Sequence, residues 1–375
     1  MYFLNGSRIY IKPESGCNSS ETQLRSCINK LGEINSGKRI YKINFFVDAN
    51  SEEDYIKLSK LAEEIVSIQI SEKIILNFIS QAPLACKVIA EAFYYDPSIW
   101  NAKFIFHPGG NAVLFQNNSS RFLVGNVQSI KSSMCLNQSE EAFLVLKEIF
   151  ELNDFKIGSI IRQWNYIEDI LGVEKGKQNY QEFNNVRSRF YGTAFSKSGY
   201  PSATGIGMNR GGVIIEFIAL DSKKVVSKPI ENPNQIAAHN YSKQVLIGDE
   251  NISKTTPKFE RARYLDLLGR KAIFISGTAS VVGENTIGID NPAEQTKVTI
   301  QNIQQLYSNG VLENISGKLE PKYGHARVYV KSRKDYKIIR RMFRLYYGDL
   351  PVVYILADIC RTDLLVEIEG EVILE

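Results

Sequence analysis

"IFISG" spans Ile273 to Gly277, and two closely similar segments occur earlier in the chain: "YFLNG" from Tyr2 to Gly6 and "RFLVG" from Arg121 to Gly125. Each segment places Phe and then Leu or Ile ahead of a glycine. Such a run predicts a strand that breaks at its glycine. Self-similarity at long spacing indicates a chain built from repeated units.

The same elements are predicted to follow each of these segments. A helix with apolar residues at helical spacing comes first, then a strand rich in β-branched and aromatic residues. The helices are "ETQLRSCINKL", "SEEAFLVLKEIF" from near Ser139 and "PAEQTKVTIQNIQQLY" from near Pro292; the strands are "RIYKINFFV", "SIIRQWNYI" and "HARVYV". A second helix begins at Asp54-Tyr55, Asn179-Tyr180 and Asp335-Tyr336, and each unit closes with a proline and a strand that carries an acid.

The order strand, helix, strand, helix, strand is therefore predicted three times. We expect a divergent unit at 1–100, a second unit at 101–222 and a third at 259–375. Residues 223–258 are polar and interrupted by proline, so they predict a connector that also crosses the working surface. At 375 residues the chain is long enough for such a division.

Composition excludes several classes of function. A content of 44% hydrophobic and 23% charged residues is typical of a soluble globular protein. The net charge of +4 comes without a block of like charges, so nucleic acid is not an expected partner. Five scattered cysteines and three histidines encode neither a disulfide framework nor a zinc site. A polar Asn-Gly-Ser follows the short apolar start, and no apolar run is long enough to span a membrane, so we expect a cytoplasmic protein.

The third unit, read as "IFISGTASVVGENT", "EQTKVTIQNI" and "DLLVEIEGE", resembles the small trimeric RidA/YjgF proteins. With "FNNVRSRFY", "YPSATGIGM", "NPNQIAAHNYS", "PKFERA" and "ICRTDLLVEIEGE", the chain from about Ile160 onward resembles the chorismatases. The resemblance implies an α+β fold of three RidA/YjgF-like (chorismate-mutase-like) βαβ units, arranged in one chain as a pseudo-trimer. A monomer would then suffice, although the sequence leaves the oligomeric state open.

Chorismatases hydrolyse the enolpyruvyl ether of chorismate to pyruvate and either a hydroxybenzoate or a dihydroxycyclohexadiene carboxylate. The resemblance places the catalytic acid at Glu367, in the segment "VEIE". A carboxylic acid suits this reaction, because it can protonate the vinyl carbon and then accept a proton from the attacking water. Glu369 and Glu371 alternate with Glu367, and we interpret these two as a solvated strand face.

Chorismate carries two carboxylates, which predicts separate arginine donors because a guanidinium matches a carboxylate in shape. The candidates are Arg187, Arg261 and Arg344, with Tyr241 as a phenol donor; a surface arginine and a core tyrosine are the alternatives. His239 is interpreted as structural.

Gly205 and Gly277 lie at predicted turns where a ligand could approach the backbone. By resemblance, Gly277 and Cys360 favour the hydroxybenzoate-forming branch, although turn geometry and a small buried residue would also explain them. "TGIGMNRGG" lacks the spacing of a nucleotide loop and predicts a hairpin turn at Asn209 to Gly212, so no cofactor and no metal are expected.

Two alternatives to a chorismatase with chorismate as its partner remain. One is an imine or enamine deaminase of the RidA type, which would leave the motif-bearing connector unexplained. The other is a non-catalytic protein that binds a small molecule.

Overall fold

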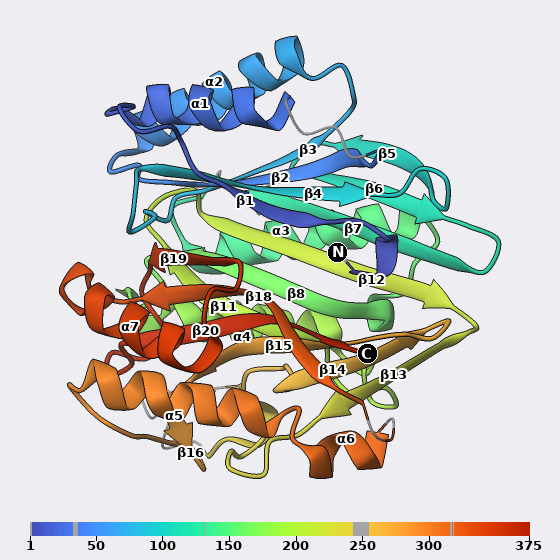
Figure 1. Cartoon of the computed structure of the whole chain (residues 1–375), viewed down its shortest axis with the longest axis vertical. Coiled ribbons are helices and arrows are strands. Elements are labelled where there is room, and N and C mark those ends of the chain that lie inside the picture. Colours follow the sequence, from blue (N-terminus) through green and yellow to red (C-terminus); the bar gives the residue numbers. More distant parts are fainter. Residues whose placement is uncertain (1, 33–36, 131, 243–254, 316, 318) are drawn as a thin grey trace.

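The computed structural model describes residues 2–32, 37–130, 132–242, 255–315, 317 and 319–375. Part of the predicted connector, residues 243–254, lies outside these ranges. The described residues form three large mixed sheets with helices packed along the outside of the molecule (Figure 1). The predicted α+β class is confirmed.

The first sheet has the strand order β1-β4-β2-β3, in which only the pair β2 and β3 is parallel. Its elements are β1 (Arg8–Ile11), α1 (Ser20–Gly32), β2 (Arg39–Val47), α2 (Glu52–Gln69), β3 (Ile75–Ile79) and β4 (Val88–Tyr95). Helix α2 begins at an N-cap serine, Ser51, whose side chain accepts a hydrogen bond from the Asp54 amide.

The second sheet has the order β11-β8-β12-β7-β6-β5. Its elements are β5 (Asn101–His107), β6 (Gly110–Gln116), β7 (Ser120–Ser129), α3 (Cys135–Leu152), β8 (Ile160–Glu168), α4 (Asn179–Tyr191), β11 (Ser202–Met208) and β12 (Val213–Ser222), with the short hairpin β9 (Val173–Glu174) and β10 (Lys177–Gln178) ahead of α4.

The third sheet has the order β13-β14-β15-β20-β18-β19. Its elements are β13 (Val225–Ile230), β14 (Ala262–Leu267), β15 (Arg270–Ala279), β16 (Val281–Val282), β17 (Asn285–Thr286), α5 (Pro292–Gln305), α6 (Asn309–Ile315), β18 (Pro321–Val330), α7 (Tyr336–Tyr347), β19 (Val352–Leu356) and β20 (Val366–Leu374). Strand β13 comes from the predicted connector, and it pairs with β14. The predicted unit boundaries themselves remain a proposal.

One four-strand pattern recurs in all three sheets. The orders β1-β4-β2-β3, β7-β12-β8-β11 and β15-β20-β18-β19 have the same directions, with one parallel pair at the end. In each unit, the elements of this pattern follow the predicted order of strands and helices with one strand more, because the closing segment forms a parallel strand and then the acid-bearing strand. The second and third units also contain further strands, such as β5, β6 and β14.

The glycine segments differ from their prediction. Tyr2–Leu4 form a turn of 3₁₀ helix, and the first strand starts only at Arg8. Gly125 lies inside β7, where a Cβ would be 2.4 Å from the carbonyl oxygen of Asn111 on the neighbouring strand. The glycine therefore permits close pairing instead of ending the strand. In β15 the register shifts between Ile275 and Thr278, so Gly277 sits in a bulge.

The three sheets share a central core. Each sheet packs one face against its own helices, in separate clusters of buried apolar residues. The opposite faces meet in one cluster that joins the three units, for example through Phe46, Trp164 and Tyr329.

Buried ion pairs connect the units in a cycle at this shared core. A cation on a middle strand of each unit pairs with a glutamate on the last strand of another: Lys42 with Glu216, Arg162 with Glu369, and Arg327 with Glu91. The three glutamates occupy equivalent positions in their units. In the strand registers Glu216 lies opposite Trp164, Glu369 opposite Arg327 and Glu91 opposite Asn44. A closed cycle of this kind is what a pseudo-trimer predicts.

The interpretation of Glu369 and Glu371 as a solvated face is wrong. Glu369 is 2% exposed and Glu371 is 6% exposed. Both acids face the junction of the units. There Glu369 pairs with Arg162 and Arg327, which stabilise a buried charge that water stabilises elsewhere.

Candidate active site

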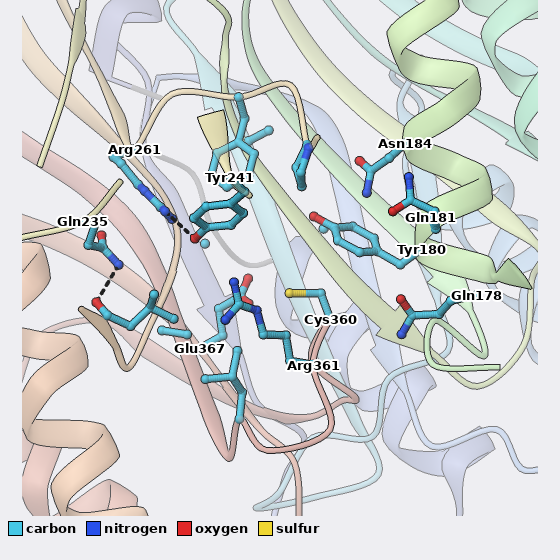
Figure 2. A pocket seen from close by; sticks show the side chains of 18 residues that line it. Gln178, Tyr180, Gln181, Asn184, Gln235, Tyr241, Arg261, Cys360, Arg361 and Glu367 are labelled. Atoms are coloured by element: carbon cyan, nitrogen blue, oxygen red, sulfur yellow. Dashed lines mark hydrogen bonds between the residues drawn. The ribbon is translucent and has the colours of Figure 1, made fainter. Parts of the chain in front are cut away.

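A pocket of about 760 Å³, including its mouth, lies where the second and third units meet (Figure 2). Helix α4 and strand β11 form one wall, and β15, β20 and the loop between β19 and β20 form another. Gln235, Tyr241 and Pro257 contribute from the segment that joins the two units. Its size is typical of a site for a small organic ligand.

Glu367 lies in the wall of this pocket, on β20. Its side chain is 4% exposed and accepts no hydrogen bond from the described residues. Burial raises the pKa of Glu367 to about 8, with a further contribution from the charge of Glu369, against the opposing effect of Arg162 and Arg261. The carboxyl is therefore protonated at neutral pH and can act as an acid.

Gly277 makes room for this carboxyl. A Cβ at position 277 would lie 2.0 Å from Oε1 of Glu367 and 3.1 Å from a methyl carbon of Thr204. The amide of Gly277 donates a hydrogen bond of 3.0 Å to the hydroxyl of Thr204, which holds the bulge in place. Because Gly277 has no side chain, the Glu367 carboxyl can occupy this space.

Arg261 and Tyr241 form a donor pair on one side of the pocket (Figure 2). The guanidinium of Arg261 donates to the Tyr241 hydroxyl and, at 2.8 Å, to the carbonyl of Ile236. Arg361 lies 5.2 Å from the centre of the Tyr241 ring and donates to the Glu284 carbonyl. Neither arginine pairs with a carboxylate of the described residues, so both can receive an anion.

Arg187 lies one layer behind the pocket wall. It is 1% exposed and donates a 2.6 Å hydrogen bond to Asn184, which lines the pocket. Its Nε finds no partner, and within the described part of the chain no carboxylate neutralises it. A buried cation without a counter-ion is costly, and an anion in the neighbouring pocket would lower that cost.

Cys360 and Gly205 line the same pocket. Burial raises the pKa of the Cys360 thiol to about 12, so the thiol stays protonated. A Cβ on Gly205 would lie 2.9 Å from the ring of Tyr180, which packs across this glycine. His239, interpreted as structural, packs against Tyr200, with 5.3 Å between the ring centres and the ring planes tilted by 55°.

Arg344, predicted as a substrate-binding residue, does not line this pocket. It lies on α7, which packs along the outside of the third sheet (Figure 1). Its side chain is 48% exposed and pairs with Asp349 at 2.6 Å. The helix turns its apolar residues, including Phe343, toward the sheet, and its arginines therefore face outward.

Several pocket residues escaped the sequence analysis. Arg361 directly follows Cys360, and Tyr180, Gln181 and Asn184 lie within about one turn of α4. Their spacing of three and four residues was a usable signal, because it places side chains on one helix face. Gln235 and Phe259 carried no such signal, since irregular segments bring them to the pocket.

Within the described ranges, no group of three or more His, Cys, Asp or Glu side chains is placed to hold a metal ion. None of the described helices combines the length and apolar character needed to span a bilayer.

The fold and the site together define a class of protein: an enzyme of three similar units with one pocket between two of them. The pocket holds a buried acid of raised pKa and two arginines, Arg261 and Arg361, that pair with no carboxylate of the described residues. The family model described as "Chorismatase FkbO/Hyg5-like, N-terminal" matches residues 98–219. A 3-hydroxybenzoate synthase from Streptomyces hygroscopicus is 34% identical over 242 residues, which cover 62% of this chain and 68% of that protein. A chorismatase from Streptomyces rapamycinicus is 32% identical over 225 residues, covering 57% of this chain and 64% of that protein.

The chain belongs to the chorismatase family. A chorismatase crystal structure matches the fold with a TM-score of 0.71 and 20% identity, and the match covers 98% of both chains. A structure of a YjgF family protein from Neisseria meningitidis matches 32% of this chain and 91% of its own, with a TM-score of 0.23.

Proposed function

We propose that this enzyme hydrolyses the enolpyruvyl ether of chorismate, releasing pyruvate, and that its second product is a hydroxybenzoate. The observation that carries the proposal is the buried carboxyl of Glu367, whose pKa burial raises to about 8, in a pocket with two arginines that pair with no carboxylate of the described residues. The similarity to a 3-hydroxybenzoate synthase and to a chorismatase supports the same substrate and product.

The first step is proton transfer from Glu367 to the terminal methylene carbon of the enolpyruvyl group. This step forms an oxocarbenium ion, and it requires an acid that keeps its proton at neutral pH. A pKa of about 8 meets that requirement, whereas an ordinary glutamate would already be ionised. Water then adds to the cation and gives its proton to the Glu367 carboxylate. The resulting hemiketal collapses to pyruvate and the ring alcohol, and the acid is restored.

Two carboxylates of the substrate require separate cations. Arg261, supported by Tyr241, lies close enough to Glu367 to influence its pKa, so we assign it to the enolpyruvyl carboxylate. Arg361 and the buried Arg187, acting behind Asn184, are assigned to the ring carboxylate. Gln181 and Asn184 of α4 line the pocket, and we assign their side-chain amides to the ring hydroxyl group of the substrate (Figure 2).

Which second product forms depends on whether the ring loses a molecule of water. Hydrolysis alone gives the dihydroxycyclohexadiene carboxylate and pyruvate, and loss of water from that ring gives a hydroxybenzoate. Gly277 and the neutral thiol of Cys360 line the pocket near Glu367, and we assign them to the ring of the substrate. By analogy with the 3-hydroxybenzoate synthase, we assign 3-hydroxybenzoate as the product.

Incubation of the purified protein with chorismate tests the proposal. We expect one pyruvate for each chorismate consumed, with 3-hydroxybenzoate identified by mass spectrometry and NMR. Replacement Glu367→Gln should lower kcat by roughly 10²-fold or more while chorismate binding persists, because the amide cannot donate an acidic proton. Absence of pyruvate, together with ammonia release from an enamine substrate, would instead support a RidA-type deaminase.

A further inference from the structure

Glu369 lies two residues after Glu367 on β20, so the two side chains leave the same face of the strand. Glu369 does not line the pocket, but its carboxylate is surrounded by hydrogen-bond donors. The donors are the side chains of Trp164 at 2.9 Å, Arg327 at 3.1 Å and Tyr329 at 3.2 Å, together with Arg162 and Thr204.

The environments of Glu367 and Glu369 therefore differ in their hydrogen-bond donors, although the two side chains are neighbours on the same face of β20. Glu369 receives two guanidinium groups, which stabilise its ionised form, whereas no described residue donates to Glu367. Two carboxylates this close in a buried site are not both ionised without a large cost. The donors place the negative charge on Glu369 and leave the proton on Glu367.

We propose that Glu369 is a positioning residue whose fixed negative charge keeps the catalytic carboxyl of Glu367 protonated in the free enzyme. The inference rests on the proposed role of Glu367 as the general acid. Glu369 acts through Glu367 without contacting the substrate.

The other groups around Glu367 do not reverse this effect. Arg162 and Arg261 favour ionisation of Glu367, but each contributes less than Glu369, and burial, the largest effect, also favours the protonated form. Cys360 of the β19–β20 loop and Tyr180 of α4 are neutral, because burial raises the pKa of both groups. The phenol of Tyr329, opposite Glu367 on β18, is neutral for the same reason, and Arg361 completes the charged groups of the pocket wall.

The first unit participates through Glu91, which pairs with Arg327 of the third unit. This guanidinium donates to Glu369 and also to Glu91 of β4, which in turn accepts from Arg8. Because Arg327 pairs with both Glu91 and Glu369, its positive charge does not neutralise Glu369 alone. The described residues of the first unit contribute none of the side chains that line the pocket, and this contact gives the unit a part in catalysis.

Replacement Glu369→Gln tests the inference through the pH profile of kcat. In the unmodified enzyme, activity should fall as the pH rises through about 8, where Glu367 loses its proton. In the variant this fall should move to lower pH by about one unit or more, because the neighbouring negative charge is gone. Replacement Glu91→Gln should shift it in the same direction by less, and it serves as the second variant if Glu369→Gln does not fold.

Glu216→Gln is the matched control. Glu216 holds the same position on β12 and is buried in the ion pair with Lys42, but the residue two positions before it is Ile214 instead of an acid. The control should lose a similar amount of thermal stability and leave the pH profile in place. An unchanged profile in both Glu369→Gln and Glu91→Gln, or an equal shift in the control, would overturn the inference.

Infrared difference spectroscopy provides a readout that does not depend on turnover. The band of a protonated carboxyl that is lost in Glu367→Gln reports the proton on Glu367 directly, and in Glu369→Gln it should disappear at lower pH. If Glu367→Gln turns over normally, the proposed function of Glu367 fails, while the band still tests the inference. If Glu367→Gln is inactive and the band titrates unchanged in Glu369→Gln, the inference alone fails.

Discussion

At Glu367 the absence of hydrogen-bond donors matters as much as burial. A glutamate with the same burial and several cationic neighbours, such as Glu91, has its pKa lowered to about 2. Glu367 lacks those neighbours, and its pKa rises to about 8. The chemical role of each acid thus depends on which side chains from other strands reach it.

The raised pKa has a cost in stability that Glu367→Gln should remove. The pKa of Glu367 is about 8 in the folded chain, against a reference value of 4.5. As the pH rises between these values the unfolded chain loses this proton first, so the free energy of unfolding falls. Gln does not titrate, and the variant should become more stable than the unmodified protein above about pH 8, by on the order of 4 kcal/mol.

Urea unfolding of both proteins at about pH 5 and about pH 9 measures this difference. The stability advantage of the variant should be small at the lower pH and large at the higher one. A constant difference would show that Glu367 does not hold its proton on folding.

Gly277→Ala tests whether the absence of a side chain at position 277 determines where the Glu367 carboxyl lies. The new Cβ would overlap the Glu367 carboxyl, which would rotate away because its end is flexible. We expect a folded protein with kcat reduced by roughly 10- to 100-fold and an altered ratio of products. Product analysis by mass spectrometry gives the ratio; a constant ratio would contradict the assignment of Gly277 to the product branch.

At the scale of elements, a comparison of the last strands of the three units explains why an acidic side chain lines the pocket between the second and third units. Strands β4, β12 and β20 begin with the similar segments Val88–Glu91, Val213–Glu216 and Val366–Glu369. The second position of these segments is Ile in the first two and Glu367 in the third. The fourth position is a glutamate in all three, and each of these pairs with another unit.

Arginines on different elements should differ in their effect on substrate binding. Arg261, next to the start of β14, faces the pocket, whereas Arg344 on α7 pairs with Asp349 at the surface. Arg261→Ala should raise KM by roughly 10- to 100-fold through loss of a charged hydrogen bond. Arg344→Ala should stay within about twofold, because an exposed pair contributes little. Steady-state kinetics with chorismate compares them, and equal effects would contradict the pocket assignment.

At the scale of the whole molecule, the cycle of buried ion pairs determines which strands meet. A buried pair contributes little net stability, because loss of hydration offsets the attraction between the charges. Removal of one partner is costly, since it leaves the other charge buried alone. These pairs therefore favour one arrangement of the three sheets over other ways of packing similar apolar faces.

A double substitution at Lys42 and Glu216 tests this view. Lys42→Met alone should lower the free energy of unfolding by about 3–5 kcal/mol, because Glu216 would remain buried without its cation. Lys42→Met combined with Glu216→Leu should recover most of the loss. Denaturant unfolding measures both, and a double variant less stable than the single one would show that the pair supplies net stability.

Much of the fold could be predicted because its signals are local. The helices at Ser20–Gly32 and Pro292–Gln305 follow apolar spacing, and the latter also has an N-cap asparagine and a proline in its first turn. The segment at Tyr2–Leu4 was predicted wrongly, since three apolar residues before a turn fit either a strand or a 3₁₀ turn. The candidate site was reached mainly through family resemblance, and Arg344 shows that a motif alone does not reveal which way a helix faces.

By itself, the sequence determined the repeated order of strands and helices and the acids on the closing strands, because periodicity and residue type are local properties. Only the tertiary structure decided which acid keeps its proton. Glu367 and Glu369 are chemically identical side chains on one strand, and their difference comes from Arg162, Thr204 and Arg327 on other strands. Burial and charge depend on neighbours that are distant in the chain, and folding alone brings those neighbours together.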